Sequence, residues 1–142
     1  MLRGQFESVG EQTPAELRAA YDDRLAETIE RVGVETVVAE SGVDGAVVEA
    51  LAAGDSPDLT LEAAAAILAI DEKLPDAEAV EAEARDILLM GMSTAVLDVE
   101  AIAAGINDEM EPKEIQQKVE GRYPMQLDEY ATLHRFIESE KR

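Results

Sequence analysis

The residues best suited to contact another molecule lie close to the carboxyl end of the chain. They are two lysines, two glutamines and an arginine in one predicted helix and the turn after it: Lys113, Gln116, Gln117, Lys118 and Arg122. Lysine and arginine neutralise phosphates, and glutamine hydrogen-bonds base edges when a helix enters a DNA groove. This segment is therefore the candidate surface for nucleic acid or for an acidic partner. The alternative is that Lys113 and Lys118 pair with nearby glutamates on a solvated helix.

Side chains that carry out catalysis or bind metals are scarce. His134 is the only histidine and stands beside Arg135 in a helical pattern, so we expect it to pack or to lie at the surface. The chain has no cysteine, which excludes disulfides and thiolate metal sites. It has no glycine-rich phosphate loop, nucleophile elbow or His-x-x-x-His pair. Acid pairs such as Asp22-Asp23 suit a solvated face better than a metal ion, so we expect no enzyme, no cofactor and no metal site.

The chain is strongly acidic, with 32 Asp and Glu against 12 Lys and Arg and a formal net charge of -20 over 142 residues. The excess lies in residues 1–111, because residues 112–142 carry equal numbers of acids and bases. Acid excess, scarce lysine and small apolar side chains resemble the proteome of salt-accumulating haloarchaea. The whole chain resembles the small acidic haloarchaeal proteins grouped as families of unknown function. The alternative is an acidic protein from a low-salt organism that binds basic partners.

The apolar pattern predicts an all-α fold, a compact multi-helix bundle. Hydrophobic residues make up 46% of the chain but aromatic residues only 4%, so small and aliphatic side chains must fill the core. Caps and periodicity predict no strand and eight helices, over residues of about 14–32, 34–40, 44–53, 60–74, 77–90, 98–104, 112–120 and 128–138. A break is predicted at residues 91–93, and Asp128 is predicted to cap the last helix. Four methionines (Met90, Met92, Met110 and Met125) suit an adaptable apolar surface, but filling the core is the plainer expectation.

Residues 34–70 have the spacing of a DNA-binding unit. The stretch VAESGVD at positions 38–44 ends one short helix and begins another across a glycine, and an alanine-rich helix follows. This resembles the helix-turn-helix of the phage-repressor-like (Cro/C1 type) family. The resemblance implies that Ala39 is the small residue packed against the next helix and that Gly42 is the turn glycine. It also implies that Val48 and Leu51 are buried.

The resemblance fails where that family reads DNA. The exposed start of the third helix carries only acids and small residues here: Asp44, Gly45, Ala46, Glu49 and Ala50. None of them can make the bidentate contact of arginine to guanine or of glutamine to adenine. Residues 34–70 contain no lysine or arginine. We therefore expect this unit to serve in packing rather than in DNA binding.

A weaker echo of the same segment follows later in the chain. Residues 99–106 repeat the pattern of residues 35–43, and five positions between 121 and 137 match five between 54 and 70. Two helical units, residues 13–74 and 76–142, would then form a degenerate repeat, and with it a second helix-turn-helix-like unit, within a single domain of residues 1–142. Chance similarity between alanine-rich helices explains the echo equally well.

Two function classes remain open. The first is a non-enzymatic, helix-turn-helix-like regulatory protein of a halophilic archaeon, related to transcription, that contacts DNA through its carboxyl-terminal third. The second is a protein–protein interaction adapter in which the helix-turn-helix unit is only structural. The partners would be DNA or another protein, and a homodimer with two Lys113–Arg122 helices about 34 Å apart would favour DNA. A contiguous apolar patch in the carboxyl-terminal third would favour the adapter.

The sequence also predicts where the protein works. Residues 1–7 lack an apolar run and predict no signal peptide. No stretch approaches the roughly 18 apolar residues of a membrane span. We therefore expect a cytoplasmic protein without a membrane partner.

Salt should stabilise the fold. Repulsion among the carboxylates of residues 1–111 is expected to lower the melting temperature in dilute buffer, and molar salt shortens the Debye length to about 3 Å and screens that repulsion. Thermal unfolding in about 0.1 M and about 2 M KCl measures the difference. Equal melting temperatures in the two buffers would exclude adaptation to high salt.

Overall fold

The computed structural model describes residue 6 and residues 8–141, and over these residues the chain is all-α, as predicted. A short 3-10 helix and eight α-helices follow one another: η1 (Val9–Glu11), α1 (Pro14–Val32), α2 (Val34–Ser41), α3 (Gly45–Ala52), α4 (Leu61–Leu68), α5 (Ala77–Ala95), α6 (Val99–Gly105), α7 (Pro112–Val119) and α8 (Leu127–Glu140). These residues include no strand, only an isolated antiparallel bridge between Thr60 and Gln126. The signal-peptide prediction concerns residues that, apart from Phe6, lie outside the described ones.

Local sequence signals account for several helix ends. The Thr13 side chain accepts the Glu16 N–H at 3.1 Å, and the Glu16 carboxylate accepts the Thr13 N–H at 2.9 Å. Pro14 then begins α1, as a capping box with proline at the first helical position predicts. Gly33 and Gly42 end α1 and α2 with φ of 92° and 72°, a region that glycine adopts at least cost.

The segment that resembles a helix-turn-helix matches expectation at three of four positions. Gly42 has the predicted left-handed conformation, and Val48 and Leu51 are buried. The prediction that Ala39 packs against α3 is wrong, because Ala39 is exposed. Val37 is fully buried instead, and a residue two positions further along a helix points about 200° away.

The predicted break at residues 91–93 is also wrong, because α5 continues through it to Ala95. Gly91 is buried inside the helix, against α8. A Cβ at this position would lie 2.6 Å from Cγ2 of Ile137, which is far too close. The glycine therefore permits close packing of two helices and does not end one.

Two further helix boundaries differ from the prediction. The cap of α8 is Gln126, whose N–H is accepted by the Glu129 carboxylate at 2.8 Å, and not Asp128. The Asp128 carboxylate instead accepts a hydrogen bond at 2.6 Å from Arg18, a residue far away in the sequence. α4 ends at Leu68, and the chain turns well before residue 74.

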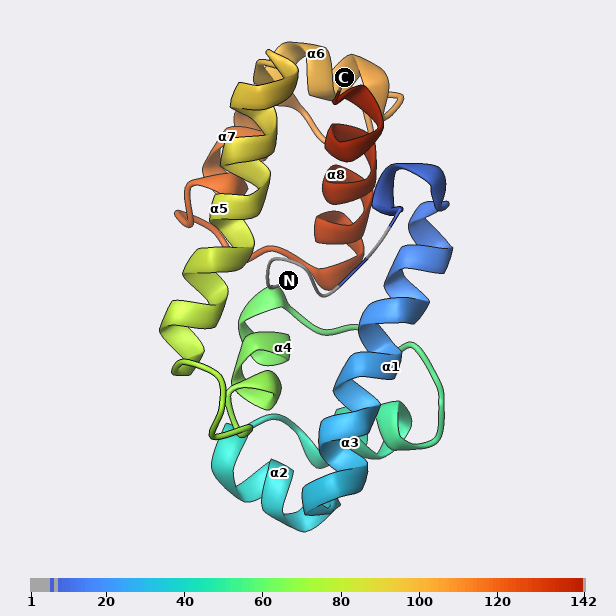
Figure 1. Cartoon of the computed structure of the whole chain (residues 1–142), viewed down its shortest axis with the longest axis vertical. Coiled ribbons are helices and arrows are strands. Elements are labelled where there is room, and N and C mark those ends of the chain that lie inside the picture. Colours follow the sequence, from blue (N-terminus) through green and yellow to red (C-terminus); the bar gives the residue numbers. More distant parts are fainter. Residues whose placement is uncertain (1–5, 7, 142) are drawn as a thin grey trace.

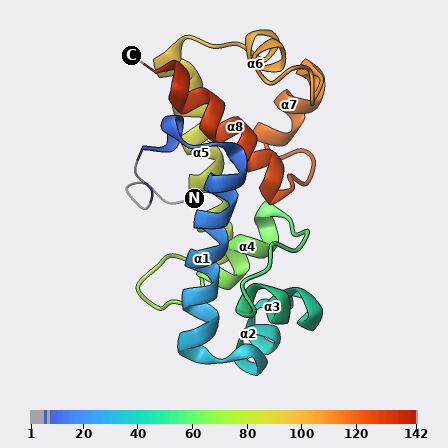
Figure 2. The same ribbon diagram turned by 90° about the vertical axis from the view of Figure 1, so that its right-hand side faces the viewer.

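The eight α-helices fall into two halves with the same order of elements. Each half opens with a helix of 19 residues, continues with two short helices, and ends with a helix packed on both long ones. Figures 1 and 2 show α2 and α3 at one end of the molecule and α6 and α7 at the other, with α4 and α8 between them. The starts of α4 and α8 meet at the centre, where Leu61 N–H donates to the Met125 carbonyl at 2.7 Å and Leu127 N–H donates to the Leu59 carbonyl at 2.9 Å. This reciprocal pair of hydrogen bonds joins the two halves at the centre of the molecule.

A buried arginine ties α1 to this centre. Arg18 is only 5% exposed, and its Nε donates to Asp22 at 2.8 Å. One terminal nitrogen donates to Asp128 at the start of α8, and the other donates to the carbonyl of Pro57. The Ser56 hydroxyl donates to the second oxygen of Asp22. A single guanidinium therefore joins α1, the loop before α4 and the first turn of α8.

Arg18→Met is expected to lower the free energy of unfolding by about 3–5 kcal/mol, because it leaves the Asp22 carboxylate buried without its partner. Urea unfolding followed by circular dichroism measures the change. Arg122→Met is the matched control, since Arg122 pairs with Glu120 at an exposed position and should contribute less than about 1 kcal/mol. Equal losses in the two variants would contradict the role assigned to Arg18.

Candidate interaction surface

The five residues proposed to contact a partner lie on α7 and in the turn after it, and most of their polar groups are engaged. Lys118 Nζ donates to Glu114 at 2.7 Å and also to Glu129. Partial burial alone would lower the pKa of Lys118, but these two hydrogen bonds outweigh it and the pKa is raised. Lys118 thus remains charged and fully committed to protein carboxylates, as the alternative interpretation of the sequence predicts for it.

The other members of this set offer little free charge. Arg122 pairs with Glu120 at 2.9 Å, and the Gln116 amide donates to the same side chain at 3.3 Å. Gln117 is half-buried. Lys113 is exposed and makes no ion pair within the described residues. The set therefore presents one unneutralised cation from α7 to solvent.

Most arginines in the rest of the chain also form ion pairs or hydrogen bonds with other residues of the protein. Arg24 and Arg31 approach Asp71 at 4.0 and 3.3 Å. Arg85 pairs with Glu81 at 2.9 Å, and Arg135 donates to a backbone carbonyl at 3.0 Å. The surface that remains is acidic, so electrostatics disfavour an approach to phosphate.

The single histidine is a packing residue. His134 is buried, and its Nδ1 lies 2.6 Å from the hydroxyl of Tyr21, which is fully buried. Burial lowers the pKa of His134 to about 3, so the ring is neutral at physiological pH and shares one hydrogen bond with the Tyr21 hydroxyl. Neither group reaches solvent in a way that would serve catalysis.

The described residues contain neither a cluster of metal-ligating side chains nor a single helix that could span a membrane. No three His, Asp or Glu side chains among residues 6 and 8–141 come together in a way that could hold a metal ion. In the same part of the chain, no single helix is both long and apolar enough to cross a membrane. The pair α5 and α6 meets that test only when taken together, and the chain bends by 94° between them.

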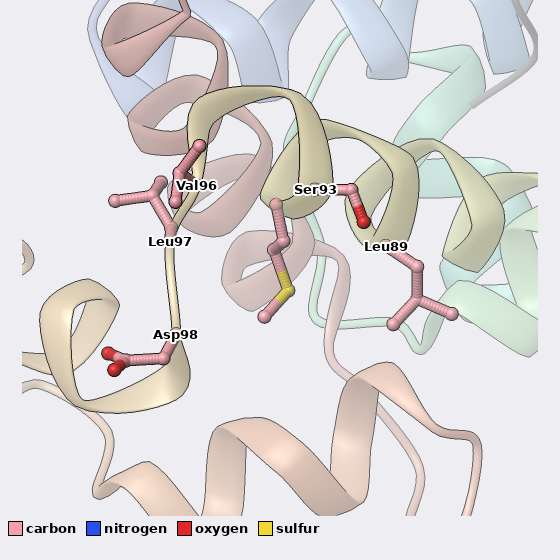
Figure 3. A pocket seen from close by; sticks show the side chains of 6 residues that line it. Leu89, Ser93, Val96, Leu97 and Asp98 are labelled. Atoms are coloured by element: carbon pink, nitrogen blue, oxygen red, sulfur yellow. The ribbon is translucent and has the colours of Figure 1, made fainter.

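The most distinctive surface feature is an apolar groove at the carboxyl end of α5. It is a hollow of about 510 Å³ lined by Leu89, Met92, Ser93, Val96, Leu97 and Asp98. Figure 3 shows Leu89 directed from α5 into this space, Val96 and Leu97 at the turn, and Asp98 at the start of α6. Among the described residues, two of the four exposed large apolar side chains line it, Leu89 at 39% and Val96 at 89%, and a third, Met90 at 57%, follows Leu89 on α5. Clustered exposed apolar side chains mark a surface that contacts another molecule.

Val96 is exposed in a strained conformation. It ends α5 with φ of 55° and ψ of 52°, the left-handed region, which is unusual for a β-branched residue. The conformation costs about 1–2 kcal/mol, and almost no burial offsets it. In the equivalent corner of the first half, Gly33 makes the turn without such a cost. Strain of this kind collects at functional positions.

The groove is open because the second half closes less tightly than the first. In the first half, α3 packs along α1, and one glycine, Gly33, separates α1 from α2. In the second half, residues 96–98 separate α5 from α6, and α7 contacts α5 over a smaller surface. The end of α5 is thus left uncovered where the end of α1 is covered.

The methionines were the only sequence signal for this groove, and they divide into two pairs. Met110 and Met125 are buried, as expected of residues that fill the core. Met90 is exposed and Met92 lines the groove, so the adaptable apolar surface exists for this pair.

The fold and this groove define an acidic, all-α protein with an apolar groove at the end of α5. Residues 17–140 match a family described as a family of unknown function (DUF5791), and the chain belongs to that family. The match runs from the first turns of α1 to the end of α8, so the family unit includes both halves. No curated protein and no solved structure matches the chain.

Val96→Gly is expected to raise the free energy of unfolding by about 1 kcal/mol, because glycine adopts this conformation without strain. Urea unfolding of both proteins measures the difference. Ala95→Gly is the control one residue earlier, inside the helix, and should lower stability by about 0.5–1 kcal/mol. A loss of stability in both variants would show that Val96 is not strained.

Proposed function

We propose that this protein is a non-enzymatic interaction adapter that holds a partner protein in the groove at the end of α5. The observation that carries the proposal is the gathering of Leu89, Met90 and Val96 at one corner of an otherwise acidic surface. A monomer without a partner would gain from burying or replacing these side chains. The helix-turn-helix-like segment of α2 and α3 then serves only to build the first half of the bundle.

The charges of the molecule support the adapter more than a DNA-contacting regulator. The exposed start of α3 offers Asp44 and Glu49 to a partner, and Lys113 is the one lysine of α7 that forms no ion pair. A regulator that used α7 would have to bind phosphates with this lysine against a net charge of -20. Because cationic contacts dominate affinity for DNA, such binding would be weak.

A salt-rich cytoplasm is the setting that we propose for the adapter. Molar salt strongly screens repulsion between exposed charges, and salting-out ions strengthen apolar association. An apolar groove is a contact that keeps its strength under these conditions, whereas a contact made only of ion pairs does not.

Site-specific photocrosslinking in native host cells tests the proposal. A photoreactive amino acid is placed at Ser93 in the groove, at Lys113 on α7, or at the exposed control position Glu30 on α1. The adapter predicts a discrete protein adduct from position 93 and none from position 30. Adducts to nucleic acid from position 113 alone would favour the regulator. Equal labelling from positions 93 and 30, or no protein adduct from position 93, would contradict the adapter.

A further inference from the structure

The rim of the groove is negative, and its charges are not neutralised within the described residues. Asp98 lines the groove at the start of α6, and Glu100 is exposed one turn along. Asp86 is exposed on α5, three and four residues before Leu89 and Met90, so it lies on the same helical face. None of these three carboxylates forms an ion pair there, whereas the nearest cation on α5, Arg85, is bound to Glu81.

The helix end beside the groove adds to this negative potential. The carboxyl end of a helix carries a partial negative charge, which a lysine or arginine in the last turn normally offsets. The last turn of α5 contains no basic residue. Side chains entering the groove therefore meet both rim carboxylates and an uncompensated helix end.

The shape of the groove indicates what kind of segment it would hold. α5 and α6 meet at a bend of 94°, and the hollow of about 510 Å³ along the end of α5 and the connection to α6 has room for more than one large apolar side chain. The described residues have no open sheet edge that could bind an extended peptide by strand addition. An amphipathic helix, with apolar residues at spacings of three and four, is the mode that suits a groove between helices.

We propose that the occupant of the groove is a cationic amphipathic helix of a partner protein. This inference rests on the proposed adapter function and assigns its partner class. Apolar side chains of the partner fill the hollow beside Leu89, and flanking lysines or arginines face Asp86, Asp98 and the end of α5. A second copy of this chain is a poor occupant, because few of its cations on the described helices lack a carboxylate partner and both copies carry a charge of -20.

Fluorescence anisotropy with three helical peptides tests the proposal. The first peptide has leucines at spacings of three and four with flanking lysines, the second replaces the lysines by glutamines, and the third is a scramble of the first. At about 0.1 M KCl we expect the lysine peptide to bind about threefold to tenfold more tightly than the glutamine peptide. The difference should vanish at about 2 M KCl, while binding through leucine persists. The scramble should not bind.

Variants of the protein then locate the contact. Leu89→Ser with Met90→Ser should abolish binding of both amphipathic peptides. Asp86→Asn with Asp98→Asn should remove the preference for lysine, and asparagine at 98 still caps α6. Glu35→Gln with Glu40→Gln on α2 removes the same charge far from the groove and should leave the preference intact.

The outcomes separate this inference from the adapter function. Equal binding of the lysine and glutamine peptides, with loss of both in the Leu89 and Met90 variant, keeps the groove but overturns a cationic partner. Binding of the lysine peptide that survives this variant, or binding of the scramble, shows attraction to the acidic surface alone and overturns the inference. Binding of neither peptide also overturns it, and the crosslink from position 93 then decides separately on the adapter.

Discussion

The guanidinium of Arg18 is the point at which the two halves of this molecule are held in register. It binds Asp22 on its own helix, Asp128 at the start of α8 and the carbonyl of Pro57 before α4. Lysine could not replace it, because a single ammonium cannot reach three acceptors arranged around a plane. The reciprocal backbone hydrogen bonds of Leu61 with Met125 and of Leu127 with Leu59 lie next to these acceptors in sequence, so Arg18 supports the point where the halves meet.

Helix ends set by neighbouring residues could be predicted from the sequence, and helix ends set by distant residues could not. Thr13 and Gly42 act within a few residues of themselves, so their caps and turns follow from local rules. Gly91 leaves room for the side chain of Ile137 on α8, and the Asp128 carboxylate accepts a hydrogen bond from Arg18 on α1. Both contacts join residues that are far apart in the sequence. The two halves have the same order of helices, and the repeat stays a prediction. The central bridge nevertheless pairs Thr60 with Gln126, one residue out of step with the sequence match.

The candidate surface was harder to predict for the same reason. Residue type identified Lys118 as a cation, but its partner Glu129 belongs to another helix. The core face of α5 is formed by Val80, Ala84, Leu88 and Gly91, whereas Leu89 and Met90 lie off that face and are exposed. Most described arginines pair with carboxylates of the same chain, which makes the exposed apolar side chains at the end of α5 the better candidates for contact with another molecule. The exposed methionine was the one local sign of this.

The central bridge also governs when the molecule can finish folding during synthesis. It joins Leu59 and Leu61 to residues close to the carboxyl end, Met125 and Leu127. A nascent chain can form α1 to α4 early, but the centre stays open until nearly the whole polypeptide has left the ribosome. Contacts so far apart in sequence close late and slowly. Until then Leu59 and Leu127, which are buried in the folded protein, stay uncovered.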